Sequence, residues 1–111
     1  MTSRPTTSPF DPNIPVAYLP LNSRSHAFAV RDPDAPCIIV NETVLDEDWF
    51  TEDHLMIVLA HETGHILGET SDEMTADELG MELMESAGMP ETLEMYQEEY
   101  KTRIEVGHYD K

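Results

Sequence analysis

The stretch His61-Glu62-Thr63-Gly64-His65 follows a run of six apolar residues, and together they predict a buried helix over about residues 51–67. Residues four apart lie on one face of a helix, so His61 and His65 can present two imidazole nitrogens to one metal ion. Glu62 is rotated by about 100° from His61 and projects beside the pair. This H-E-x-x-H pattern indicates a metal site, although two surface histidines at helical spacing would give the same letters.

Capping residues set the limits of this helix and of the two that follow it. Thr51 or Asp48 can cap its N-terminus, and Gly68 suits its C-terminal end. A second helix is predicted from about Asp72 to Ala87, and a third over residues 90–105 with a proline in its first turn.

The second helix places two carboxylates, Glu73 and Asp77, on a face that is otherwise apolar or small. Burying an ionised carboxylate is costly unless it is paired or binds a metal. A catalytic zinc ion usually takes three protein ligands, so we expect Glu73 to join His61 and His65 as the third. Asp77, one turn further along, is placed to accept the other ring N–H of a histidine ligand. Asp72 and then Glu69 are the alternative third ligands.

Three short apolar segments precede the first helix. Residues 14–19, 25–30 and 37–41 read as strands, and their short connections favour an antiparallel meander. The predicted fold class is therefore α+β, a small three-stranded, mostly antiparallel sheet packed on three helices. Residues 1–13 are expected to form a flexible arm, residues 14–106 a single domain, and residues 107–111 a C-terminal tail.

Composition limits the partners of this chain. Its formal net charge is −17, and the whole acidic excess lies after residue 40, which disfavours nucleic acid and anionic lipid as partners. The sequence shows no run long enough to span a bilayer and no apolar leader, so no membrane partner is expected. Its single cysteine, Cys37, is expected to be a buried, reduced thiol, which fits a cytoplasmic protein. The sequence does not indicate the oligomeric state.

H-E-x-x-H followed by a helical E-x-x-x-D resembles the motif pair of the gluzincin metallopeptidases. Three stretches carry the similarity: Cys37–Leu45, Leu59–Ile66 and Glu73–Gly80. They resemble the catalytic core of the CAAX-prenyl-protease type, whose soluble single-domain relatives are called minigluzincins. The resemblance covers about residues 14–90.

This resemblance implies a zinc-dependent metallopeptidase that hydrolyses peptide bonds in peptide or protein substrates. Glu62 would act as general base on a metal-activated water. The strand at about residues 37–42 would be the sheet edge that pairs with an extended substrate. Relatives of the minigluzincin type also imply that the C-terminal tail can lie across the site. The sequence offers five candidates for the donor that stabilises the oxyanion: Tyr96, Tyr100, Arg103, His108 and Tyr109.

Two departures from the gluzincin pattern bear on these expectations. The gap from His65 to Glu73 is short, so the turn between the helices must be tight. The spacing also half-matches the metzincin pattern, with Ser71 where that pattern has His or Asp.

The first alternative function is a metal-binding regulatory or interaction protein on the same fold, with little or no proteolysis. The second is an acidic interaction module in which the motif is accidental.

Overall fold

A mixed sheet of four strands forms one layer of the structure, a computed structural model that describes residues 4–109. The strands are β1 (Thr7–Ser8), β2 (Asp11–Leu19), β3 (Ala27–Val30) and β4 (Cys37–Asn41). Their order across the sheet is β1-β2-β4-β3. The β2–β4 pair is parallel, and the β1–β2 and β3–β4 pairs are antiparallel. The α+β class is as predicted, but the three-stranded meander is wrong in strand number and in strand order.

The strand order follows from Asn41 and from the loop that precedes β3. Asn41 is buried at the end of β4, and its side-chain amide donates to the carbonyl oxygens of Ser23 and Ser25 at 3.0 and 3.1 Å. It also accepts from the backbone N–H of Leu21 at 3.2 Å. These bonds hold the loop of residues 20–26 across the end of β4. This loop carries the chain from β2 across the end of β4, so that β3 pairs with the side of β4 that faces away from β2.

The N-terminal segment is part of the sheet. Residues 7–8 form β1 and residues 11–13 begin β2, so the expectation of a flexible arm is wrong for them. Ser8 is buried, and its hydroxyl is 2.7 Å from that of Thr63 on the helix behind the sheet. Residues 1–3, and residues 110–111 of the predicted tail, lie outside the described residues.

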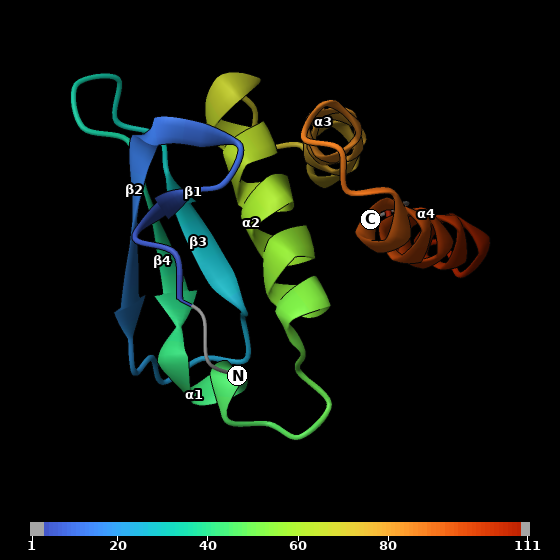
Figure 1. Cartoon of the computed structure of the whole chain (residues 1–111), viewed down its shortest axis with the longest axis horizontal. Helices are drawn as coiled ribbons and strands as arrows, with labels where there is room; N and C mark the ends of the chain where they lie inside the picture. The colour runs from blue at the N-terminus through green and yellow to red at the C-terminus, as the bar shows by residue number, and fades with distance from the viewer. Residues whose placement is uncertain (1–3, 110–111) are drawn as a thin grey trace.

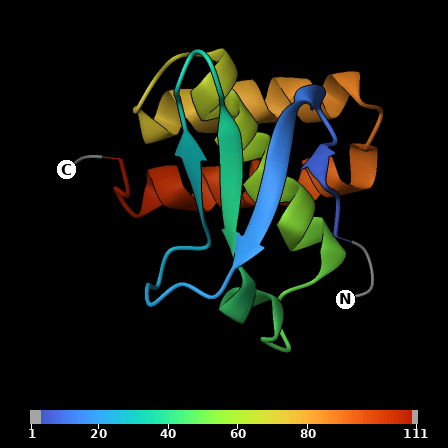
Figure 2. The same cartoon turned by 90° about the vertical axis from the view of Figure 1, so that its left-hand side faces the viewer.

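The helices form the other two layers (Figure 1). After the short α1 (Glu42–Leu45), α2 (Glu52–Leu67) packs against the sheet. Behind α2 lie α3 (Glu73–Ser86) and α4 (Pro90–Glu105), so that the sheet stands in front of these three helices in Figure 2. Thr51 caps α2, Asp72 caps α3, and Pro90 opens α4, in agreement with the predicted helix limits to within a residue.

The central layer position of α2 explains why its sequence is apolar on more than one side. Leu55 and Leu59 pack with the sheet residues Ile38 and Val40 in one core cluster. Ile57 and Ala60, Met84 of α3 and Tyr96 of α4 form a second cluster on the opposite side of α2. None of the helices within residues 4–109 has the length and apolar character needed to cross a lipid bilayer.

Candidate metal centre

Two histidines of α2 and a glutamate of α3 converge at one point. The Nε2 atoms of His61 and His65 are 3.1 Å apart. The carboxylate of Glu73 reaches both rings, with Oε2 at 2.8 Å from Nε2 of His61 and Oε1 at 3.2 Å from Nε2 of His65. The Glu73 side chain is 58% exposed, but its carboxylate faces the imidazoles. These three residues are also the ones whose ligand atoms all lie within 4.8 Å of one another.

The other ring nitrogen of each histidine is held by an acceptor. Nδ1 of His61 is 2.7 Å from Oδ1 of Asp77, and Nδ1 of His65 is 2.8 Å from the carbonyl oxygen of Thr70. A carboxylate and a carbonyl oxygen only accept, so each Nδ1 carries a proton and donates it. When each ring is neutral, this arrangement keeps its proton on Nδ1 and directs the Nε2 lone pair into the shared site, which is the tautomer that a metal ligand needs.

The donor set fits a small divalent cation. Bonds of about 2.0–2.1 Å in a tetrahedral zinc site place neighbouring donor atoms about 3.3 Å apart. The separations among the three side chains here, 2.8 to 3.2 Å, are close to that value. Two nitrogens and one carboxylate oxygen are also a donor set that suits zinc, and they leave a position for a fourth ligand.

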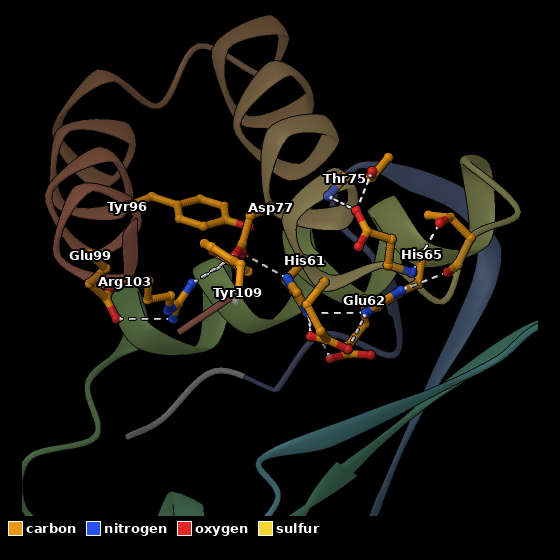
Figure 3. Close-up of polar contacts among 12 residues, drawn as sticks. His61, Glu62, His65, Thr75, Asp77, Tyr96, Glu99, Arg103 and Tyr109 are labelled. Atoms are coloured by element: carbon orange, nitrogen blue, oxygen red, sulfur yellow. Dashed lines mark hydrogen bonds and ion pairs between the residues drawn. The ribbon is translucent and has the colours of Figure 1, made fainter. Parts of the chain in front are cut away.

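Asp77 connects the centre to α4 and the C-terminal turn (Figure 3). Besides the His61 ring, its buried carboxylate accepts from the Tyr96 hydroxyl at 2.8 Å and from the Arg103 guanidinium at 3.0 and 3.1 Å. The hydroxyl of Tyr109 donates to Oδ2. Four donors from three segments thus fix the acid that orients His61.

The charges around His61 favour a cation at its ring. Burial acts to lower the pKa of His61, but its hydrogen bond to Asp77 and the charges of Asp77, Glu62 and Glu73 raise the pKa above its usual value. Burial of Asp77 opposes its ionisation, yet the hydrogen bonds from His61 and the two tyrosines lower the pKa of that carboxyl to about 2. A negative field that favours imidazolium also favours a metal ion at Nε2.

Glu62 lies beside the three converging side chains, with Oε2 4.0 Å from Nε2 of His61. It is 9% exposed, and its burial raises the pKa of the carboxyl to about 7. The charge of His61 opposes this rise, and the charges of Glu73 and Asp77 add to it. A carboxyl with a pKa near neutrality can both take and return a proton at physiological pH.

Two glycines let α3 approach α2 closely enough to form this arrangement. A Cβ atom at Gly64 would lie 2.5 Å from the backbone oxygen of Ala76, and one at Gly80 would lie 3.0 Å from the backbone of Ala60. The turn between the helices is tight, as the short spacing predicts. It places Glu69 at a φ of +48° and aims the Thr70 carbonyl at His65.

The alternative third ligands have other positions. Asp72 is exposed and accepts from the backbone N–H of Thr75 at 2.9 Å as the cap of α3. Glu69 is exposed in the turn. Within residues 4–109, neither belongs to the group of side chains that could share an ion with His61 and His65.

A cleft of about 610 Å³ opens in front of the centre, between α2 and β3. It is lined by residues 24–29 and Arg31 on the sheet side, by His61, Glu62 and His65 on α2, and by Arg103 and His108 at one end. The sheet edge at the cleft is β3, because β4 lies between β2 and β3. The expectation that residues 37–42 form the edge strand is therefore wrong.

Several residues of the site were not identified from the sequence. The close approach that Gly64 and Gly80 allow was not predicted, although two glycines on facing sides of adjacent helices are a usual sign of close packing. Arg103, Tyr96 and Tyr109 were named as oxyanion candidates, and their contacts to Asp77 were not predicted.

A scan against protein-family models matches residues 4–89 to peptidase family M48. This match spans most of the chain. The chain belongs to peptidase family M48. The matched residues of the M48 chain include the H-E-x-x-H helix and the whole E-x-x-x-D helix. Searches of curated proteins and of solved structures found no match to this M48 peptidase-family chain.

Proposed function

We propose that this M48-family chain is a zinc-dependent metallopeptidase with a single metal centre, of the gluzincin type and similar to the minigluzincins. The observation that carries the proposal is the convergence of two Nε2 lone pairs and the Glu73 carboxylate, with each Nδ1 held by an acceptor. Accidental histidines at helical spacing would give no reason for both Nδ1 atoms to have an acceptor while both Nε2 atoms converge on one carboxylate. The chain's one cysteine favours a cytoplasmic location, which stays a prediction.

His61, His65 and Glu73 would hold the ion, and Asp77 would keep His61 in position. When bound, the ion supplies Lewis acidity, which polarises the scissile carbonyl and acidifies the attacking water. Glu62 takes a proton from that water and delivers it to the leaving amine. Burial raises the pKa of this carboxyl to about 7 in the metal-free protein, and a bound dication would lower it and so keep Glu62 ionised as the base.

We place the substrate along the free edge of β3. The backbone N–H of Asn41 donates to the carbonyl oxygen of His26 at 2.8 Å, so residues 26 and 41 form a hydrogen-bonded pair. Such pairs alternate along an antiparallel ladder, which leaves the backbone groups of Ala27 and Ala29 facing outward. An extended peptide can therefore pair with β3 while its scissile bond lies over α2.

The residues that line the cleft reduce the number of candidates for the oxyanion donor. Of the five candidates from the sequence, Arg103 and His108 line it. Arg103 already binds Asp77 and lies 3.6 Å from Glu99. We therefore propose His108 as the protein group that stabilises the oxyanion.

Glu62→Gln tests the proposed function. The amide cannot take a proton, so kcat for a fluorogenic peptide should fall by about 100-fold or more. Zinc measured by mass spectrometry should stay near one per chain, because Glu62 is not a ligand. Glu69→Gln, which changes an exposed acid of the α2–α3 turn, is the control and should change neither quantity.

Two outcomes would contradict the proposal. Wild-type protein that binds no zinc at neutral pH and cleaves no peptide would exclude a zinc peptidase. A Glu62→Gln variant that cleaves at the wild-type rate would exclude Glu62 as the general base.

A further inference from the structure

The cleft gathers positive charge in a chain that is strongly acidic elsewhere. The chain has six Lys and Arg residues against 23 Asp and Glu, yet three arginines line the cleft: Arg24, Arg31 and Arg103. Among the described residues that line it, the acids are Glu62, Glu73 and Asp77, all members of the metal centre. The formal charges lining the cleft therefore balance, whereas the chain as a whole has a net charge of −17. A bound dication would make this lining positive.

Arg24 and Arg31 differ from the other arginines in having no carboxylate partner among residues 4–109. Arg103 is 3.0 Å from Asp77, and Arg4 is 3.1 Å from Glu42. Arg24 and Arg31 are both exposed. Asp32 follows Arg31 in the chain, but its carboxylate accepts from a backbone N–H within its own turn, and it does not line the cleft.

The two arginines stand at opposite ends of the edge strand. Arg24 precedes the first residue of β3, and Arg31 directly follows its last. The strand spans about 10 Å at roughly 3.3 Å per residue. A peptide paired along β3 thus has one arginine beside the segment before the scissile bond and the other beside the segment after it. A guanidinium binds a carboxylate through two parallel hydrogen bonds, so these positions suit acidic side chains.

A peptide in the cleft is close to Arg24 and Arg31 and further from most of the acidic surface, so the arginines have the larger electrostatic effect on it. At physiological ionic strength the screening length is about 8 Å, so exposed acids beyond it on the outer sides of α3 and α4 act weakly on a peptide in the cleft. Arg24 and Arg31 lie in the cleft itself. We propose that the cleft selects peptides with Asp or Glu on both sides of the cleaved bond, and that Arg24 and Arg31 bind these carboxylates. As a statement about cleavage, this inference rests on the proposed function.

A peptide series with one common scissile pair tests the selection. The residues that flank this pair are acidic (Asp or Glu) in one set of peptides, the matching amides (Asn or Gln) in a second and Lys in a third. Both ends of every peptide are capped. For the zinc-loaded wild type, each acidic flank should raise kcat/KM up to about fivefold over its amide. The preference should shrink as the salt concentration is raised from 50 to 500 mM. Arg24→Gln and Arg31→Gln should each remove it on one side, and the double variant on both.

Arg4→Gln is the matched control, because Arg4 is exposed and pairs with Glu42 away from the cleft. It should leave the preference intact. A second series of peptides has no acidic flanks and carries a free C-terminal carboxylate. It tests whether the arginines bind the C-terminus of the peptide instead of acidic side chains. A preference for that series, removed in either variant, would overturn the assignment to acidic side chains. An equal rate for acidic and amide flanks in the wild type would overturn it too.

Binding separates this inference from the proposed function. The labelled peptides are titrated by fluorescence anisotropy into zinc-loaded Glu62→Gln protein, with and without the two arginine substitutions. If the wild type cleaves nothing but acidic peptides bind through Arg24 and Arg31, the peptidase function fails and the selection stands. If peptides are cleaved but acidic flanks give no advantage in binding, the selection fails and the function stands.

Discussion

The α2–α3 interface and the free edge of β3 border the same cleft, but they are built in opposite ways. At the interface, backbones approach through Gly64 and Gly80, and the buried Asp77 accepts from four neighbouring side chains. At the edge, β3 is short, its small residues Ala27 and Ala29 face α2, and its outward backbone groups are unpaired within the sheet. The interface is closed and holds the proposed metal ligands, whereas the edge is open and is the proposed binding site for a peptide chain. Changes at the interface should therefore affect metal binding, and changes at the edge should affect substrate binding alone.

The largest effect is expected from Gly64→Ala. Its new Cβ would meet the Ala76 backbone oxygen at 2.5 Å, so α3 must move away and take Glu73 and Asp77 with it. We expect zinc affinity to fall by about 10- to 100-fold, as for the loss of a group that orients a ligand. Competition with a chromophoric chelator measures it.

Gly88→Ala is the matched control for this change. A Cβ at Gly88 meets nothing within 4 Å, but its φ of +72° makes alanine cost roughly 1–2 kcal/mol of stability. That variant should lose stability and keep its zinc affinity. If both variants lose zinc equally, the close approach of the helices is not what builds the centre.

The next effect concerns the pH dependence of Asp77 in chelator-treated protein. Its pKa of about 2 lies below the ordinary 3.8, so the ionised carboxylate stabilises the fold above pH 3.8. That stability, about 2 kcal/mol, is lost as the pH falls towards 2. The pKa of His61 is raised above 6.5, so its protonation adds stability that is complete below pH 6.5 and is lost as the pH rises through the higher folded-state value.

Asp77→Asn removes both contributions. The difference in unfolding free energy between wild type and variant should be greatest between pH 3.8 and 6.5 and should narrow on either side. Urea denaturation at a series of pH values measures this difference. A difference that stays constant from pH 3 to 8 would show that the Asp77–His61 pair does not form in the metal-free protein.

The difference between the two regions also explains how far the sequence could predict the structure. Helix periodicity placed His61, His65, Glu73 and Asp77 on facing sides of two consecutive helices, and the structure brings these side chains into contact. The contacts are local in the chain, and a short turn leaves few ways to pack the helices. Capping residues set the helix limits for the same reason, since Thr51 and Asp72 act on the first turns that follow them.

The sheet could not be predicted in this way, because strand order depends on contacts between distant segments. The residues of β3 do not by themselves predict that β3 is the edge strand next to β4. The information is in Asn41, which fixes the loop of residues 20–26 through its side-chain hydrogen bonds. The N-terminal segment was misread for a similar reason, because the contact that buries Ser8 is made to Thr63, far along the chain.

The smallest effect is expected at the edge itself, from Ala29→Pro. The Ala29 N–H faces outward, so proline removes a donor to the substrate and leaves the bonds between β3 and β4 in place. We expect zinc content to be unchanged and kcat/KM to fall by about 3- to 10-fold, as for the loss of one hydrogen bond. Phe28→Pro changes the neighbouring residue, whose N–H faces β4, so it should instead destabilise the protein by about 1–3 kcal/mol, because a β4 carbonyl loses its donor. If the two prolines lower stability equally and Ala29→Pro leaves kcat/KM unchanged, the peptide does not bind by extending the sheet at β3.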